Sequence, residues 1–293
     1  MNNQEAKKRI LTSKEYMERD IIKKSDRSYV FNLKNNNKEL FFFGTSHITD
    51  PNDPLFSEIK EAFESFNPDM VYIEGVPQKG FEYYLEKTIS PLSDDAAKRR
   101  GEPAYVAKLT SYLKEKQIVD LESPEPTESY EVRLLEERGF SRKEIFQYYF
   151  RRLVAQYQRT YNEKPKSMDA LIEEIRKRKA YMTTESLGWS QEEISELLDD
   201  ELKIVELDNI KKYSSEVDPV PWNGKSYGRI NQASDVSWKI RDEYIVDRVA
   251  EGLKNHNKIF IVYGFSHAVV LRPAMEYLMD NISPAIQTPP NIR

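Results

Sequence analysis

The chain has no cysteine in its 293 residues, which excludes disulfide bonds, thiolate metal ligands and cysteine nucleophiles. It also lacks long apolar runs, and none approaches the roughly 20 residues that a transmembrane helix needs. The polar N-terminus has no apolar segment of the kind found in secretory signals. Charged residues make up 32% of the chain. From these absences we expect a cytoplasmic protein that makes no contact with a membrane.

A strong positive charge is missing as well. The net charge of −5 argues against a dedicated nucleic-acid-binding protein, which would normally be basic. Residues 146–167 do interleave basic and aromatic side chains, as a stacking surface for nucleic acid would. Their bulky side chains, however, recur at helical spacing, which favours an amphipathic helix with one buried face. These side chains are Phe146, Tyr149, Phe150, Leu153 and Tyr157. We expect no nucleic-acid partner.

Histidine is scarce, and two of the three histidines share one setting. The run "FFFGTSH" ends at His47, and the run "IFIVYGFSH" ends at His267. In each run a glycine closes an apolar, strand-like segment, and the histidine comes three residues after that glycine. Glycine permits sharp turns and close backbone approach at such a point. The repetition indicates a functional site, whereas His256, in "KNHNK", is expected in a solvated loop.

Hydrophobic periodicity predicts an α/β protein. A hairpin is expected over residues 28–43, and a helix over 54–66 leads to a buried strand over 70–75, which together predict a βαβ unit with a parallel pair of strands. A helix over 104–116 and a strand over 117–123 repeat the pattern.

The chain changes character between residues 128 and 200, where four helical segments follow one another. A long helix from Ser234 to His256, capped by Ser234 or Asp235, then precedes a last strand that ends at Gly264. We therefore predict a single α/β domain over residues 1–293. Its mostly parallel central sheet is flanked by helices, and residues 128–200 form a helical insertion.

Four polar side chains fall where predicted strands end, and in an open parallel sheet ligands bind at the carboxyl ends of the strands. They are His47, Glu74, Glu122 and His267. Two histidines and a carboxylate would suit a divalent metal with an open coordination position. They would equally suit a metal-free general base that a carboxylate orients. Glu122 lies in the acidic loop "LESPEP", where a solvated carboxylate is the simpler interpretation.

Arg241 is a fifth candidate, on the long helix before the last strand. Its guanidinium could reach the same edge of the sheet and bind a carboxylate or a developing oxyanion. The alternative is a surface ion pair, because the helix is rich in charges.

The ordered segments "FFFGTSHITD", "NPDMVYIEG", "RDEYIVDRVAEGL" and "IFIVYGFSHAVVL" resemble the TraB/PrgY/TIKI family, relatives of the erythromycin esterases and of ChaN-like haem-binding proteins. That family is marked by two G-x-x-H motifs, a glutamate that ends the second core strand and an arginine before the last strand. The resemblance covers residues near 40–76 and 234–275. The family's motif residues fall here on Gly44 and His47, Gly264 and His267, Glu74, and Arg241.

The resemblance implies an α/β fold and, for the TIKI branch, metal-dependent peptidase activity. On that metalloprotease-like reading His47, Glu74, Arg241 and His267 are catalytic, and His47, Glu74 and His267 bind a divalent ion such as Mn²⁺, Co²⁺ or Zn²⁺. The esterase branch instead implies a histidine base acting on water without an obligatory metal. Animal members are tethered to membranes and many TraB proteins carry C-terminal membrane helices; this chain shows neither feature, so a role in membrane signalling is not expected.

The sequence therefore predicts a hydrolase of an amide or ester bond, acting on a peptide or a small ester or amide. Two alternatives stay open. "VYGFSHA" has the context of a nucleophile elbow, with Ser266 as nucleophile and Ala268 in place of the last glycine. The same edge of the sheet could instead bind haem or a peptide signal without turnover.

Overall fold

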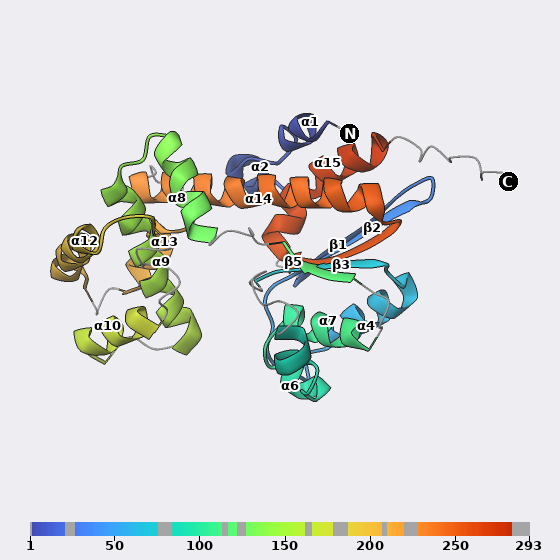
Figure 1. Ribbon diagram of the computed structural model, residues 1–293, viewed down its shortest axis with the longest axis horizontal. Coiled ribbons are helices and arrows are strands. Elements are labelled where there is room, and N and C mark those ends of the chain that lie inside the picture. Colours follow the sequence, from blue (N-terminus) through green and yellow to red (C-terminus); the bar gives the residue numbers. More distant parts are fainter. Residues whose placement is uncertain are drawn as a thin grey trace, which may run out of the picture. The chain divides into compact units, whose positions relative to one another are not determined.

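The computed structural model describes residues 2–20, 27–75, 84–112, 117–121, 127–161, 166–177, 187–206, 210–219 and 228–282 (Figure 1). The chain forms two compact units. The first consists of residues 1–122 and 242–293, and the second of residues 123–241. Helix α14, Arg229–Asn255, supplies its residues up to Arg241 to the second unit and the rest to the first.

The first unit is built on a five-stranded sheet with the strand order β1-β2-β5-β3-β4. β1 runs antiparallel to β2, whereas the other three neighbouring pairs are parallel. The predicted α/β class with a mostly parallel central sheet is thereby confirmed. The strands are β1 Ser28–Asn35, β2 Lys38–Thr45, β3 Met70–Ile73, β4 Gln117–Asp120 and β5 Lys258–Gly264.

β1 and β2 form the predicted hairpin, in which Asn35 pairs with Lys38 across a two-residue turn. Asn36 adopts a left-handed backbone with φ 53°, a conformation that asparagine tolerates better than most residues.

The neighbours of β3 differ from the prediction. β2 and β3 are parallel, but β5 lies between them and pairs with both. The local strand–helix–strand pattern predicts that β2 and β3 are parallel. It cannot predict which strand lies beside each of them, because that strand, β5, comes from the far end of the chain.

Helices cover both faces of this sheet, which explains why β3 and β5 are almost continuously apolar. α4, Leu55–Phe66, and α7, Glu102–Ser111, pack on one face, and α15, Phe265–Asp280, packs on the other together with the later part of α14 (Figure 1). Tyr72 on β3 reaches α14, where its hydroxyl donates to the carbonyl of Arg248 at 3.1 Å. The first unit also contains the short helices α1 Asn3–Lys7, α2 Ser13–Met17 and α6 Asp94–Lys98, and a π-helix at Tyr84–Ile89.

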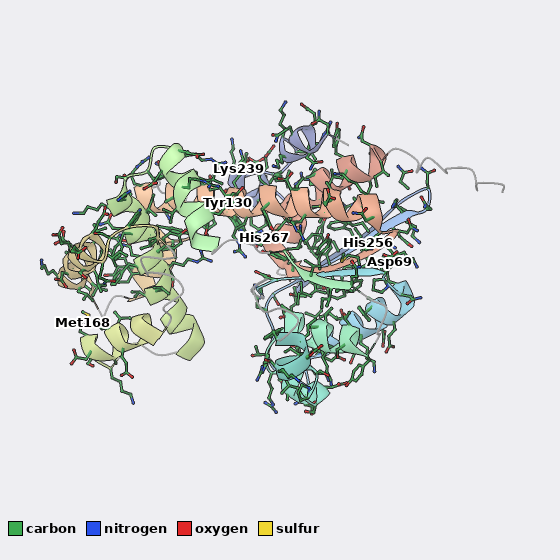
Figure 2. The ribbon with its side chains drawn as sticks, viewed as in Figure 1. Asp69, Tyr130, Met168, Lys239, His256 and His267 are labelled. Atoms are coloured by element: carbon green, nitrogen blue, oxygen red, sulfur yellow. The ribbon has the colours of Figure 1, made fainter. Side chains whose placement is uncertain are left out.

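Asp69 aligns the amino ends of β3 and β5. Its carboxylate accepts hydrogen bonds from the N–H groups of Asn257 and Lys258 at 3.0 and 2.9 Å. The carboxyl ends of these strands therefore meet at the opposite edge. Figure 2 shows Asp69 and His256 at one end of the sheet and His267 at the other. His267 thus stands at the edge where ligands bind in open parallel sheets.

The second unit is helical, and it contains the predicted helical segment 128–200 together with α13 and the first part of α14. Phe146, Tyr149, Phe150 and Leu153 of α9 are all buried in its core, which confirms an amphipathic helix rather than an exposed aromatic surface. The side chain of Tyr157 lies outside the described part of the chain. A single domain interrupted by an insertion stays a prediction. The helices are α8 Thr127–Glu137, α9 Arg142–Tyr161, α10 Met168–Lys177, α12 Gln191–Ile204 and α13 Ile210–Glu216.

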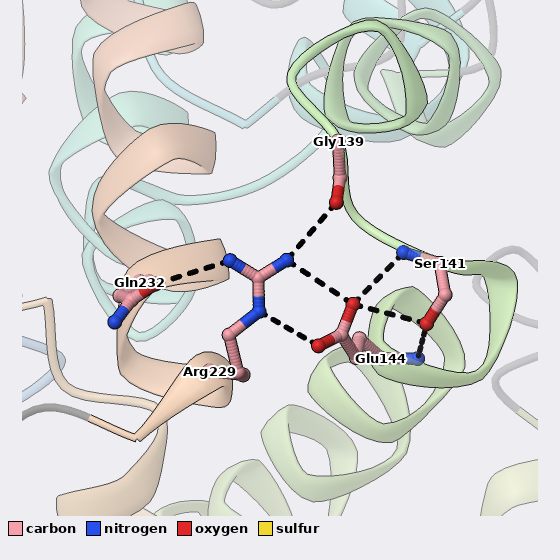
Figure 3. Close-up of polar contacts among 5 residues, drawn as sticks. All are labelled: Gly139, Ser141, Glu144, Arg229 and Gln232. Carbon is pink, nitrogen blue, oxygen red and sulfur yellow. Dashed lines mark hydrogen bonds and ion pairs between the residues drawn. The ribbon is translucent and has the colours of Figure 1, made fainter.

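α14 begins at Arg229, earlier than the caps predicted at Ser234 and Asp235. The Arg229 guanidinium binds Glu144 through two nitrogens and donates to the carbonyl of Gly139 (Figure 3). Hydrogen bonds from Arg229, and then from the backbone of Ser141, lower the pKa of Glu144 to about 2. This ion pair fixes the start of α14 to the α8–α9 turn, so the helix does not depend on a cap at Ser234.

Candidate functional site

His47 stands just beyond the end of β2. The strand ends at Thr45, which pairs with Gly264 of β5, and two residues later His47 adopts φ 59°. A left-handed backbone costs an L-residue about 1–2 kcal/mol, although histidine is found there more often than most residues. The side chain of His47 is 63% exposed. The first motif therefore places an accessible imidazole at the edge of the sheet.

Glu74 directly follows β3, the other neighbour of β5. Its Oε2 lies 3.9 Å from Nε2 of His47, and its side chain is 15% exposed. This distance is too long for a hydrogen bond, and because His47 is exposed, any attraction between the two charges is screened by solvent. Glu74 and His47 thus lie side by side at the carboxyl edge of the sheet, and their interaction depends on the charge of the imidazole.

His267 lies in the first turn of α15 and is buried. Its Nδ1 is 2.6 Å from Oδ1 of Asp242, a buried residue of α14. The ring also meets the ring of Tyr263 edge-on, with 5.0 Å between centroids. Because an ionised carboxylate only accepts hydrogen bonds, this contact places the proton of a neutral His267 on Nδ1 and leaves Nε2 as a basic nitrogen.

The three side chains converge on one point above Gly264. A β-carbon built on this glycine would lie 3.4 Å from Glu74 Oε2, 3.4 Å from His267 Cδ2 and 3.5 Å from His47 Nε2. Since Cδ2 neighbours Nε2 in the imidazole, the ring edge opposite Asp242 faces this point. Two imidazoles and a carboxylate therefore surround the position that a side chain at Gly264 would take.

The two motif glycines serve different purposes. A β-carbon on Gly44 would approach Cβ of Ala268 to 2.5 Å and the carbonyl oxygen of Tyr29 to 2.9 Å, so Gly44 is needed for close packing of β2 against α15. Gly264 has φ −56°, which any residue can adopt. The left-handed backbone of the first motif is found at His47, three residues after Gly44.

Sequence motifs do not single out Asp242, which directly follows Arg241. A signal was present, since Asp242 continues the buried, apolar stripe of α14 by one turn toward its N-terminus. A single carboxylate in such a stripe needs a partner. The stripe consists of Ile245, Val246, Val249, Ala250 and Leu253.

The other sequence candidates are placed differently. Arg241 belongs to the second unit. Successive residues of a helix point about 100° apart, so the contact of Asp242 with His267 does not imply one for Arg241. The role of Arg241 at the site stays a prediction. Glu122 lies outside the described residues. His256 directly follows α14 at the opposite edge of the sheet, where its carbonyl accepts a hydrogen bond from Nζ of Lys38 at 2.9 Å. Ser266 occupies the first turn of α15, next to His267.

The described residues do not form a ready metal site. Nowhere in the described ranges are three histidine, aspartate or glutamate side chains grouped so that they could hold a metal ion. His47 Nε2 and Glu74 Oε2, at 3.9 Å, are farther apart than the roughly 3.4 Å between two ligands of a tetrahedral zinc. The predicted ligand set of His47, Glu74 and His267 therefore gains no support from this arrangement.

The described helices also include none that is long and apolar enough to cross a membrane.

No curated protein and no solved structure is detectably similar to this chain. The model of the TraB/PrgY/gumN family, however, matches residues 29–272. The matched range contains both G-x-x-H motifs, Glu74, Arg241 and Asp242, and it covers most of the chain. The chain therefore belongs to the TraB/PrgY/gumN family.

Proposed function

We propose that this protein hydrolyses an amide or ester bond at the carboxyl edge of its parallel sheet. The observation that carries the proposal is the space above Gly264, which His47, Glu74 and His267 surround. Asp242 behind His267 adds the orienting carboxylate that a histidine base requires. Family membership alone does not specify a reaction, so the proposal rests on these four side chains.

In the proposed reaction Nε2 of His267 removes a proton from water as the water oxygen attacks the carbonyl carbon. The carbonyl π electrons move to oxygen and give a tetrahedral intermediate. When this intermediate collapses, the C–N or C–O bond breaks and the leaving group takes the proton back from the imidazolium. Asp242 stabilises the imidazolium between these two steps, as buried carboxylates do in histidine-dependent hydrolases.

His47 and Glu74 act on the exposed side of this space. His47 is accessible to substrate, and the Glu74 carboxylate lies 3.9 Å from its Nε2. A protonated His47 can donate a hydrogen bond to a substrate oxygen that becomes negative during the reaction. His47 and His267 therefore take different roles, one as a donor and the other as the base.

A divalent metal is the competing version of this proposal. The resemblance to metal-dependent peptidases suggested Mn²⁺, Co²⁺ or Zn²⁺, and a carboxylate behind a histidine, as Asp242 stands behind His267, is also typical of metal-binding histidines. A bound ion would supply Lewis-acid activation of water or of the carbonyl group.

Chelation separates the two versions. With a histidine base we expect hydrolysis of a panel of p-nitrophenyl esters, anilides and short peptides to survive exhaustive chelation. If chelation abolishes activity and Mn²⁺, Co²⁺ or Zn²⁺ restores it, the metal version is correct. A protein that binds haem or a peptide tightly but turns over none of the panel would instead be a binding protein.

Arg241→Lys tests the predicted clamp. A guanidinium offers paired donors that lysine lacks, so the variant should keep the wild-type melting temperature but lose transition-state stabilisation. We expect kcat/KM to fall by an amount equivalent to about 2–4 kcal/mol, as for loss of one oxyanion donor. Arg248→Lys, on the same helix, is the control. A lower melting temperature with unchanged activity per folded molecule would make Arg241 a structural residue.

A further inference from the structure

Glu102 is a buried carboxylate that the proposed reaction does not use. It is the first residue of α7 and is 1% exposed. Its Oε1 accepts the backbone N–H of Ile48 at 2.8 Å, a contact between segments that are distant in the sequence. Gly101, with φ 94°, comes directly before it, and a β-carbon there would lie 3.7 Å from the carbonyl oxygen of Ile48. The start of α7 therefore packs on the residue after His47.

This contact falls where the backbone is strained. Residues with a left-handed backbone persist only where their surroundings fix them. On one side of His47, Thr45 is fixed by its pairing with Gly264. On the other side, the side chain of Ile48 is buried in the core cluster shared with α4 and α7, and its N–H is bound by Glu102. Glu102 thus supplies a polar anchor directly beside His47.

We propose that Glu102 is a positioning residue of the site, which holds His47 in its left-handed conformation beside Glu74 and Gly264 by binding the N–H of Ile48. The consequence for catalysis rests on the proposed function, but the positioning itself does not. A purely structural role is the rival explanation, because an acidic residue at a helix start stabilises the helix through its dipole.

Two variants of equal length separate these roles. Glu102→Gln keeps an oxygen that can accept from Ile48 but removes the charge, whereas Glu102→Met removes both. Glu102→Asp keeps the charge at the helix start and withdraws the carboxylate by one methylene, so it serves if the Met variant fails to fold. Thr110→Val is the control: its hydroxyl donates to Val106 within the same helix at 2.8 Å, in a buried position. It perturbs α7 without touching Ile48.

The readouts are amide hydrogen exchange at Ile48 and the imidazole cross-peak of His47 at a fixed pH. With only three histidines in the chain, the imidazole spectrum is simple to assign. We expect Glu102→Met and Glu102→Asp to speed exchange at Ile48 by about tenfold or more relative to amides of β2, since the local opening is no longer opposed. The His47 cross-peak should move while that of His256 stays. Glu102→Gln and Thr110→Val should resemble the wild type in both readouts.

Folded Met or Asp variants with unchanged Ile48 exchange and an unchanged His47 cross-peak would overturn the proposal. So would a Gln variant that changes as much as the Met variant, because the charge and not the hydrogen bond would then matter. If a hydrolysed substrate is found, Met should lower kcat about tenfold or more and Gln should restore most of it. If no substrate is hydrolysed by the wild type, the proposed function fails while the exchange and cross-peak results still decide the role of Glu102.

Discussion

Replacing Gly264 with alanine is expected to lower the rate of hydrolysis about 100-fold or more while the protein folds normally. The new methyl group would lie 3.4–3.5 Å from Glu74, His267 and His47 and would narrow the space in which, on our proposal, water and the reacting carbonyl bind. Displacement of reacting groups by about 1 Å can lower a rate about 100-fold, so we expect kcat/KM to fall at least that far.

Stability should change little in this variant, because the backbone of Gly264 has φ −56° and ψ 141° and no contact would be shorter than 3.4 Å. Gly264 is the N-cap of α15, and alanine is a poorer cap by up to about 1 kcal/mol. The reduced entropy of the unfolded chain offsets a similar amount. Thermal melting and steady-state kinetics measure the two effects separately.

Gly44→Ala is the matched control from the other motif. Its methyl would overlap Cβ of Ala268 at 2.5 Å and the carbonyl oxygen of Tyr29 at 2.9 Å. Overpacking of this kind costs about 1–3 kcal/mol, so Gly44→Ala should lower the melting temperature. Full activity in Gly264→Ala would show that the space above Gly264 is not where the reaction takes place.

Asp242→Asn should cause the largest loss among conservative changes. The asparagine has nearly the same shape, but its amide N–H₂ can donate to Nδ1 of His267 and move the imidazole proton to Nε2. The base would then face the substrate in the wrong tautomer, which costs about 10⁴-fold in kcat in related histidine–aspartate pairs. Nitrogen chemical shifts of His267 should report the change of tautomer directly.

Asp247→Asn provides the comparison on the same helix. Asp247 binds Nζ of Lys7 at 2.5 Å and its side chain is 42% exposed, so its loss should affect stability slightly and activity not at all. Wild-type kcat in Asp242→Asn would remove His267 from the role of base and leave His47 as the remaining histidine at the site.

The sequence predicted the elements of the first unit well because their patterns are local. Apolar runs ending at Thr45, Ile73 and Gly264 predict strands wherever they lie, and the spacing of apolar residues in α4 predicts one buried face. The position of β5 between β2 and β3 was not predictable, because it depends on contacts between residues at opposite ends of the chain.

The site shows the same division. Short motifs selected His47, Glu74 and His267 as candidates, and the structure brings them together because each follows a strand that ends at the same edge; their roles stay a prediction. Asp242 and Glu102 required the structure. Each lies on a helix, and the sequence does not reveal which other segment that helix packs against. The contacts of Asp242 with His267 and of Glu102 with Ile48 form only when the helices pack in the folded unit.

The central place of β5 has a consequence for biosynthesis. β2 and β3 leave the ribosome before the second unit is made, and each then lacks the strand that pairs with both. Unpaired strand edges invite pairing with other chains, so the nascent protein carries two such edges until residues 258–264 emerge. The helical second unit emerges in between and has its own core. A chain whose synthesis ends within α14 would thus have a folded helical unit but would lack β5, so the edges of β2 and β3 would stay unpaired. Chaperones would be expected to bind such a chain.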